Sequence, residues 1–274
     1  FTAAYTFISD IVPDSRLNEG LGIFGLNGLI GIAVGPAISE PIINHFGFDA
    51  FFLTAASMAF ISLILQQFLR ETFVLKTSGN KSVSFFSVLR RRKTLGVGMV
   101  SIFFGMGLAT QSGFISPYVQ FLGLPTISIF FLSYSGGAIL TRVFGAKIAD
   151  RIGEETIVPW AIGINAIGYL ILLIVNSSGM LLVAGLVTGA GHGFLFPCLN
   201  ALAIRNEPAH IRGKISGIFT GSIDAGNLLG SLLLGYIGDW FGYRPLFFTT
   251  FLILMIGLLS FMGFLKKAIL RTDR

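Results

Sequence analysis

Eight apolar runs of roughly 20 residues or more occupy most of this 274-residue sequence. A bilayer's hydrocarbon core is about 30 Å thick, which a helix of about 20 apolar residues crosses. Mean hydropathy is +0.81 and only 12% of residues are charged, against about 25% in soluble domains. Because the runs are too long and too Gly-rich for barrel strands, we predict an all-α polytopic membrane protein. The expected spans are 20–46, 48–69, 95–119, 127–149, 158–175, 180–203, 215–238 and 245–264.

The basic residues occur in every second connection between these spans. Of the 19 Lys and Arg, Arg244 alone lies in the other set of connections, and Arg142 lies inside a span. This pattern follows the positive-inside rule and predicts that the basic connections and the C-terminus are cytoplasmic in a cell membrane. The net charge of +6 therefore indicates membrane topology, and we expect no nucleic-acid partner.

Motifs for catalysis or metal binding are absent from the sequence. The single cysteine, Cys198, lies within an apolar run, so no disulfide framework is possible. No HExxH, GxSxG or phosphate-binding loop occurs, and no Cys/His spacing suits a metal. We therefore expect no cofactor, no metal and no enzymatic activity.

An internal repeat predicts the domain organisation. A shift of 195 positions places Gly31 and Gly35 on Gly226 and Gly230, with the same orientation relative to the basic connections. Parallel repeats of this kind are typical of transporters. Residue 1 then aligns with the sixth span, so we expect about 100 preceding residues and twelve spans in two six-helix bundles. The predicted divisions are 1–69 for the rest of the first bundle, 70–94 for a cytoplasmic central loop, and 95–274 for the second bundle and tail.

Two short motifs resemble those of the major facilitator superfamily. The stretch GAKIADRIG at 145–153 resembles the second copy of the family's cytoplasmic loop signature, with Asp150, Arg151 and Gly153 in register and Glu154–Glu155 where bases are usual. The stretch GIAVGPAISE at 31–40 resembles the fifth-helix signature of the proton-driven exporters, with Ser39–Glu40 in place of a Gly pair. The resemblance implies the major facilitator fold, and the chain would run from the end of helix 4 through helix 12.

The resemblance also implies a cytoplasmic gate, which we assign to Asp150, Arg151, Gly153 and Arg142. If the two halves are pseudo-symmetric, Asp150 lies near the start of the fifth helix, around Gly20 and Gly22, where a carboxylate stabilises the helix N-terminus. The alternative is an ordinary solvated charge pair. Arg142 lies deeper in its span, and its side chain could extend toward the cytoplasm. For Arg142 and for Glu40, close to the outer interface, a structural role is favoured.

Small residues and Pro36 form a helix-packing signature on the two repeated helices. Gly31 and Gly35, like Gly226 and Gly230, lie one turn apart and allow close backbone approach, which promotes helix association in lipid. Pro36 removes one backbone hydrogen bond. Static packing and a moving joint between the halves are equally compatible with this pattern.

Polar residues inside two of the last three spans are candidates for solute or proton binding. Asp224 lies ten residues, or about 15 Å, from Lys214, and a carboxylate at this depth costs at least about 2.5–3.5 kcal/mol. Thr220 and Asn227 share its helix face, whereas Thr188 and His192 form a shorter polar face on the preceding span. We predict proton coupling or substrate contact for Asp224 and His192, with hydrogen-bonded packing as the alternative. The further candidates for a central cavity are Thr220, Asn227, Thr188, Gln111, Tyr118 and Tyr134.

The function predicted from these observations is secondary active transport of a small solute by alternating access. Proton-coupled efflux of drugs or metabolites by a monomer in the lipid bilayer is the preferred form, and proton-coupled uptake of a sugar or organic acid is the variant. Two alternatives of other classes are a membrane-embedded enzyme that uses His192 and Asp224, and a sensor that binds a solute without moving it.

Overall fold

The computed structural model describes residues 2–68 and 83–265, and every regular element in these two ranges is helical. The predicted all-α class is therefore confirmed. Residues 70–82 of the predicted central loop and the tail from 266 to 274 lie outside the described residues. The elements are α1 (Thr2–Ile11), η1 (Asp14–Arg16), α2 (Leu17–Phe24), α3 (Leu26–Gln66), α4 (Phe85–Leu89), α5 (Arg92–Ala109), the π-helical η2 (Thr110–Phe114), α6 (Ile115–Phe121), α7 (Ser128–Ile152), α8 (Glu154–Leu172), α9 (Ser178–Ile204), α10 (Ala209–Phe241), α11 (Tyr243–Ser260) and the π-helical η3 (Phe261–Leu265).

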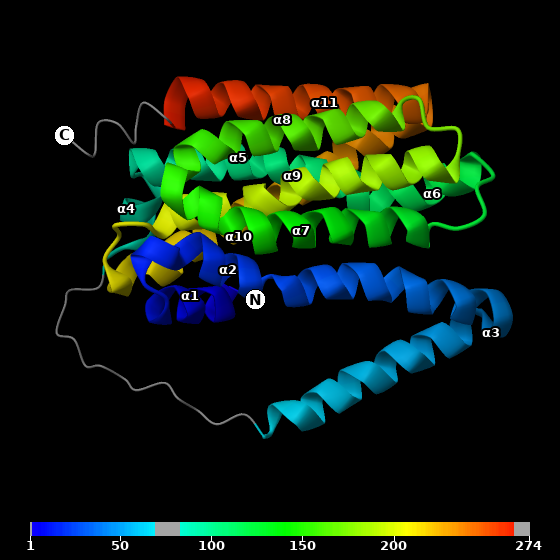
Figure 1. Ribbon diagram of the computed structural model, residues 1–274, viewed down its shortest axis with the longest axis horizontal. Coiled ribbons are helices and arrows are strands. Elements are labelled where there is room, and N and C mark those ends of the chain that lie inside the picture. Colours follow the sequence, from blue (N-terminus) through cyan, green and yellow to red (C-terminus); the bar gives the residue numbers. More distant parts are fainter. Residues whose placement is uncertain (1, 69–82, 266–274) are drawn as a thin grey trace.

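Seven helical stretches of the described chain are long and apolar enough to cross a membrane. The first, Asp14–Gln66, contains two spans, because α3 reverses at Gly47 (φ 81°) and its second limb runs back beneath the first (Figure 1). A φ of this sign is accessible to glycine and strained for other residues. The eight predicted spans therefore correspond to the observed helices, with shifts of a few residues at their ends.

Helices α5 to α11 pack side by side into one bundle (Figure 1). Glycines line its closest seams, because lipid supplies little hydrophobic force between helices and contact depends on small residues. A Cβ on Gly189 of α9 would lie 1.9 Å from the Tyr134 carbonyl oxygen of α7. A Cβ on Gly226 of α10 would lie 2.1 Å from the Ile102 carbonyl oxygen of α5. At these seams the backbones touch directly.

The N-terminal segment lies against one face of this bundle. Helix α2 and the first limb of α3 pack along α7, and α1 packs on α10 (Figure 1). Helix α2 ends at Phe24, and α3 continues in nearly the same direction after Gly25. The long contact between α2–α3 and α7 joins the part of the chain before the predicted central loop to the part after it. The predicted boundaries at 69 and 94 stay predictions.

The packing at Gly226 leads to a stability prediction on α10. Gly226→Ala should lower the free energy of unfolding by about 1–3 kcal/mol relative to Gly221→Ala, because only the first overpacks a helix seam. Gly221 lies on the same helix, and an added Cβ there would meet nothing within 4 Å. Both changes share the gain in helix propensity, so it cancels. Thermal unfolding in detergent measures the difference, and equal stability of the two variants would contradict the seam.

Candidate functional site

Asp150, at the end of α7, caps the N-terminus of α2. Its Oδ1 accepts hydrogen bonds from the Asn18 backbone N–H at 3.1 Å and from Asn18 Nδ2 at 2.8 Å. Its Oδ2 accepts the Glu19 backbone N–H at 3.1 Å. The first N–H groups of a helix lack partners within the helix and carry partial positive charge, so a carboxylate there stabilises the helix by about 0.3–1 kcal/mol, and by up to about 2 when partly buried.

Glu154 and Arg205 extend this contact into a charged cluster. Glu154, at the start of α8, accepts Asn18 Nδ2 at 2.7 Å and Arg205 Nε at 2.9 Å. Arg205, between α9 and α10, also donates to Asp150 Oδ1 at 3.2 Å and to the Asp14 carbonyl. We call Asn18, Asp150, Glu154 and Arg205 the basic-end cluster. It joins three segments that are far apart in sequence: the start of α2, the α7–α8 junction and the α9–α10 connection.

The basic-end cluster is largely withdrawn from solvent. The side chains of Asp150 and Glu154 are 7% and 6% exposed, and that of Arg205 is 23% exposed. Burial alone would lower the pKa of the Arg205 guanidinium, but its hydrogen bonds with Glu154 and the charges of Glu154 and Asp150 raise that pKa above its ordinary value. Arg205 is therefore charged at every physiological pH and holds the two carboxylates together.

The other residues assigned to the gate have different environments. Arg151 is exposed at the end of α7. Gly153 ends α7 with φ 87°, and its N–H bonds to the Ala149 carbonyl, as glycine does at many helix C-termini. Glu154 appeared in the sequence only as a departure from the family pattern, and Asn18 and Arg205 gave no local signal. Their roles follow from tertiary contacts.

Arg142 does not reach the basic-end cluster, contrary to the expectation that it extends toward that end. It is 4% exposed and lies between α7 and the N-terminal segment. Its guanidinium hydrogen-bonds to Tyr5, lies 5.7 Å from the Phe196 ring centre, and fills the space beside Gly25. Among the described residues no carboxylate forms an ion pair with it, and its Nε has no hydrogen-bond partner.

His192 lies in a buried aromatic cluster within the bundle. Its Nδ1 hydrogen-bonds to the Tyr134 hydroxyl, and its ring packs edge-on against Phe104 and parallel to Phe196. Thr188, one turn away on α9, donates to the Ala184 carbonyl at 2.7 Å. His192 Nδ1 and the Thr188 hydroxyl on this face of α9 therefore both have hydrogen-bond partners inside the bundle.

Two further cavity candidates are buried between helices of the bundle. Tyr118 donates to the Leu172 carbonyl at 2.7 Å, and its ring packs on Phe247. Gln111 is 6% exposed and lies in η2, a π-helical interruption of the α5–α6 span. Interruptions of this type often occur at functional sites.

Asp224 is exposed on α10, away from the seam that Gly226 forms with α5. Thr220 donates to the Ser216 carbonyl at 3.0 Å, and Asn227 accepts Ser231 Oγ at 3.4 Å. No hydrogen bond or ion pair joins Asp224 to His192. The two candidates for proton coupling therefore occupy different environments, one exposed and one enclosed by aromatic rings.

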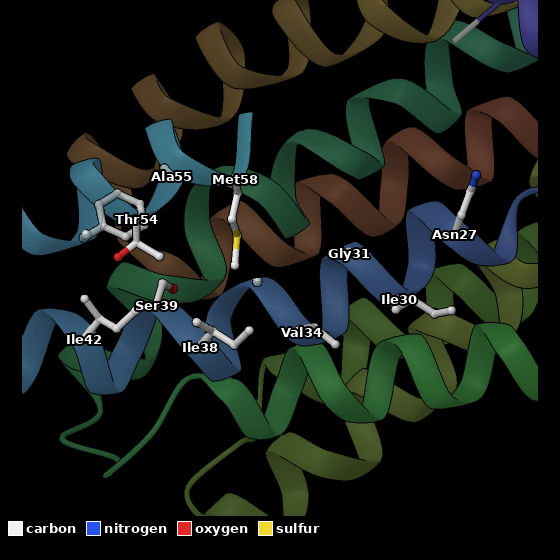
Figure 2. Close-up of a pocket in the computed structure, with 12 residues that line it drawn as sticks. Asn27, Ile30, Gly31, Val34, Ile38, Ser39, Ile42, Thr54, Ala55 and Met58 are labelled. Carbon is white, nitrogen blue, oxygen red and sulfur yellow. The ribbon is translucent and has the colours of Figure 1, made fainter. Parts of the chain in front are cut away.

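A pocket of about 460 Å³ lies between the two limbs of α3 (Figure 2). Ile30, Val34 and Ile38 line it from the first limb and Met58 from the second, so its wall is mostly apolar. Gly31 and Gly35 line the same pocket, and among the described residues an added Cβ at either one would meet no heavy atom within 4 Å apart from the adjoining turns of α3 itself. Pro36 follows them within α3.

The packing signature therefore has two different settings. Gly226 and Gly230 touch the backbone of α5. Gly31 and Gly35, their counterparts in the repeat, meet no partner among the described residues, and their packing role stays a prediction.

Comparison with known proteins agrees with this architecture. The Major Facilitator Superfamily model matches residues 1–170 and again residues 97–271. The multidrug resistance protein MdtG of Rahnella sp. (strain Y9602) is 23% identical over 262 residues, which is 92% of this chain and 64% of MdtG. The chain thus spans less than two thirds of that relative's length.

Solved structures show the same fold. The human organic anion transporter MFSD10 superposes with a TM-score of 0.73 at 14% identity, covering 95% of this chain and 67% of MFSD10. The E. coli fucose:proton symporter FucP superposes with a TM-score of 0.69 at 14% identity, covering 97% of this chain and 72% of FucP.

The fold and the matches define a multi-pass membrane protein with the major facilitator fold. The chain belongs to the major facilitator superfamily.

The charged cluster yields a prediction for Arg205. Arg205→Gln should lower the free energy of unfolding by about 1–3 kcal/mol, because Asp150 and Glu154 would remain buried beside each other without their cation. The control Arg151→Gln changes an exposed residue and should lie within about 0.5 kcal/mol of the parent. Thermal unfolding in detergent at constant salt compares them. Equal effects of both substitutions would show that the cluster contributes no stability.

Proposed function

We propose that the protein is a secondary active transporter that moves a small solute by alternating access, with the basic end in the cytoplasm and a monomer as the working unit. The observation that carries this proposal is the basic-end cluster. It connects α2, before the predicted central loop, to α7, α8 and the α9–α10 connection after it through the hydrogen bonds of Asp150, Glu154 and Arg205. These bonds hold the two parts together at one end and must break when that end opens.

Proton-coupled efflux of drugs or metabolites is the form of transport we favour. It is supported by the multidrug resistance name of the MdtG relative and by the Gly31–Pro36 motif. Asp224 and His192 are the proposed proton carriers. Asp224 lies in the middle of α10, whereas Asp239 lies at its end, and the exposed position of Asp224 suits exchange with water or solute.

Transport of an organic acid is the second candidate. The buried guanidinium of Arg142 favours it, because its Nε lacks a hydrogen-bond partner and could pair with a carboxylate of the solute. MFSD10, whose fold is similar, is a human organic anion transporter. The proposed contact between Arg142 and the solute carboxylate is the same for uptake and for efflux.

Efflux from cells that express the full-length protein tests the favoured form. Cells are loaded with fluorescent amphiphilic compounds, and their loss is followed with and without a protonophore. We expect efflux that the protonophore abolishes. Efflux that persists with the protonophore would contradict proton coupling. The absence of flux for amphiphiles, organic acids and sugars alike would contradict transport and favour a sensor.

Removing the Asp150 charge should open the basic end. In Asp150→Asn the carboxylate no longer stabilises the N-terminus of α2. Labelling of a cysteine placed at the buried position 17, by a thiol reagent added to the cytoplasmic side, should therefore rise by about two- to fivefold. The control Asp239→Asn removes an exposed carboxylate at the other end of α10 and should leave labelling unchanged. If Asp150→Asn labels like the parent, the latch role of Asp150 is wrong.

Asp224→Asn tests the coupling role. We expect the variant to exchange solute between two compartments but to show no proton movement when a solute gradient is applied, because an amide cannot carry the proton. Proteoliposomes with an internal pH dye measure this. Asp239→Asn on the same helix is the matched control. Solute-driven proton movement equal to that of the parent would refute the assignment of Asp224.

A further inference from the structure

Glu40 lies at the opposite end of the fold from Asp150. Like Asp150, it places a carboxylate at the N-terminus of another helix. From the first limb of α3, its carboxylate accepts the backbone N–H of Ile127 at 3.2 Å and that of Ser128 at 3.3 Å. The hydroxyl of Thr126 donates to it at 2.6 Å, and the hydroxyl of Ser128 donates as well. Glu40 thus caps the N-terminus of α7.

Neither capped helix can satisfy its own N-terminus from its N-cap residue. The N-cap residue of α2 is Arg16 and that of α7 is Ile127, and neither side chain carries an acceptor. A good N-cap residue is Ser, Thr, Asp or Asn. At the start of α7 the Thr126 hydroxyl also accepts the Ser128 N–H, at 3.3 Å. Both helix starts nevertheless receive a carboxylate from a different helix: Asp150 of α7 caps α2, and Glu40 of α3 caps α7.

The two contacts are spaced to match a membrane. The two contacts join α2–α3 to α7. Residues 18 and 40 lie 22 positions apart along α2–α3, and residues 128 and 150 lie 22 positions apart along α7. At 1.5 Å per residue the caps are about 33 Å apart, close to the thickness of a bilayer's hydrocarbon core. The antiparallel pair thus carries one carboxylate cap at each membrane face.

Solvent reaches the contact at Glu40. A pocket of about 390 Å³ opens beside it, with Asn44 and Phe48 on the α3 side and Ser116 and Gln120 on the α6 side. The carboxylate is partly buried, and it lines this pocket together with Thr126. Water in the pocket can replace the four hydrogen bonds when α3 and α7 separate.

We propose that Glu40 is the outer latch of the transporter: its carboxylate holds α3 on the N-terminus of α7 while the outer face is closed, and outward opening breaks these hydrogen bonds. The latch rests on the proposed function, since it acts in the same alternating-access cycle. Asp150 and Glu40 are then opposing positioning residues on one helix pair. Loss of either shifts the protein toward opening at its own end.

Cysteine accessibility in the full-length protein tests the latch. The buried Cys198 is replaced by Ala, and Ser116→Cys places a reporter in the pocket beside Glu40. In sealed cells, a membrane-impermeant maleimide reports opening of this pocket from outside. Glu40→Gln should raise the labelling rate about two- to fivefold, the range expected for a carboxylate at a helix N-terminus. Asp150→Asn should lower it.

Two further variants make the result decisive. Asp49→Asn removes an exposed carboxylate beside the α3 reversal and should label like the parent. Ser128→Ala removes one hydroxyl that donates to Glu40 and should raise labelling by less than Glu40→Gln; it carries the test if Glu40→Gln does not fold. Labelling by both Glu40→Gln and Ser128→Ala at the parental rate would overturn the latch. Solute flux through the parent protein is measured separately, so an absence of transport would refute the function without deciding the latch.

Discussion

The contact between a carboxylate and the N-terminus of a helix from another part of the chain is the interaction on which the fold's interface depends. Asp150 takes two backbone N–H groups of α2, and Glu40 takes two of α7. Unpaired N–H groups at a helix start need an acceptor when they are withdrawn from water. Because the N-cap residues Arg16 and Ile127 provide none, the association of α2–α3 with α7 supplies it. The same interaction is short-ranged and reversible, which suits a joint that opens.

The bilayer explains why the rest of the fold is held together by close helix packing. Backbone groups must be satisfied within each helix, and helices then associate through small residues. The glycine seams of α5 with α10 and of α7 with α9 bring backbones into direct contact. By contrast, the α2–α3 contact with α7 ends at both membrane faces in charged or polar groups. Movement is therefore expected at that contact rather than within the bundle.

Much of the fold could be predicted from the sequence, because apolar span length and Gly placement are local signals. The spans and the reversal near Gly47 followed from them. Asp150 illustrates a residue whose neighbourhood could be inferred from repeat symmetry, although its role remains a proposal. The partners Glu154 and Arg205 could not be inferred, since a pairing between residues 51 positions apart depends on how α8 and α9 pack.

Two residues that depart from the family pattern form contacts that the pattern does not predict. Glu40 and Glu154 stand where a glycine and a base are usual, and each forms hydrogen bonds between different helices. For Arg142, by contrast, a general rule for Arg side chains predicted the wrong location. Snorkelling is a sound expectation for a lone Arg near a helix end, but the space beside Gly25 and the Tyr5 hydroxyl accommodate the guanidinium inside the protein.

The most direct test of the account is a pair of distance measurements on one membrane-reconstituted protein. Spin labels at residues 16 and 151 report the basic end, and labels at residues 44 and 120 report the opposite end, all at exposed positions. As solute and pH are varied, the account predicts that one distance lengthens while the other stays short. Distances that lengthen together, or that never change while solute is transported, would contradict alternating access around the α3–α7 pair.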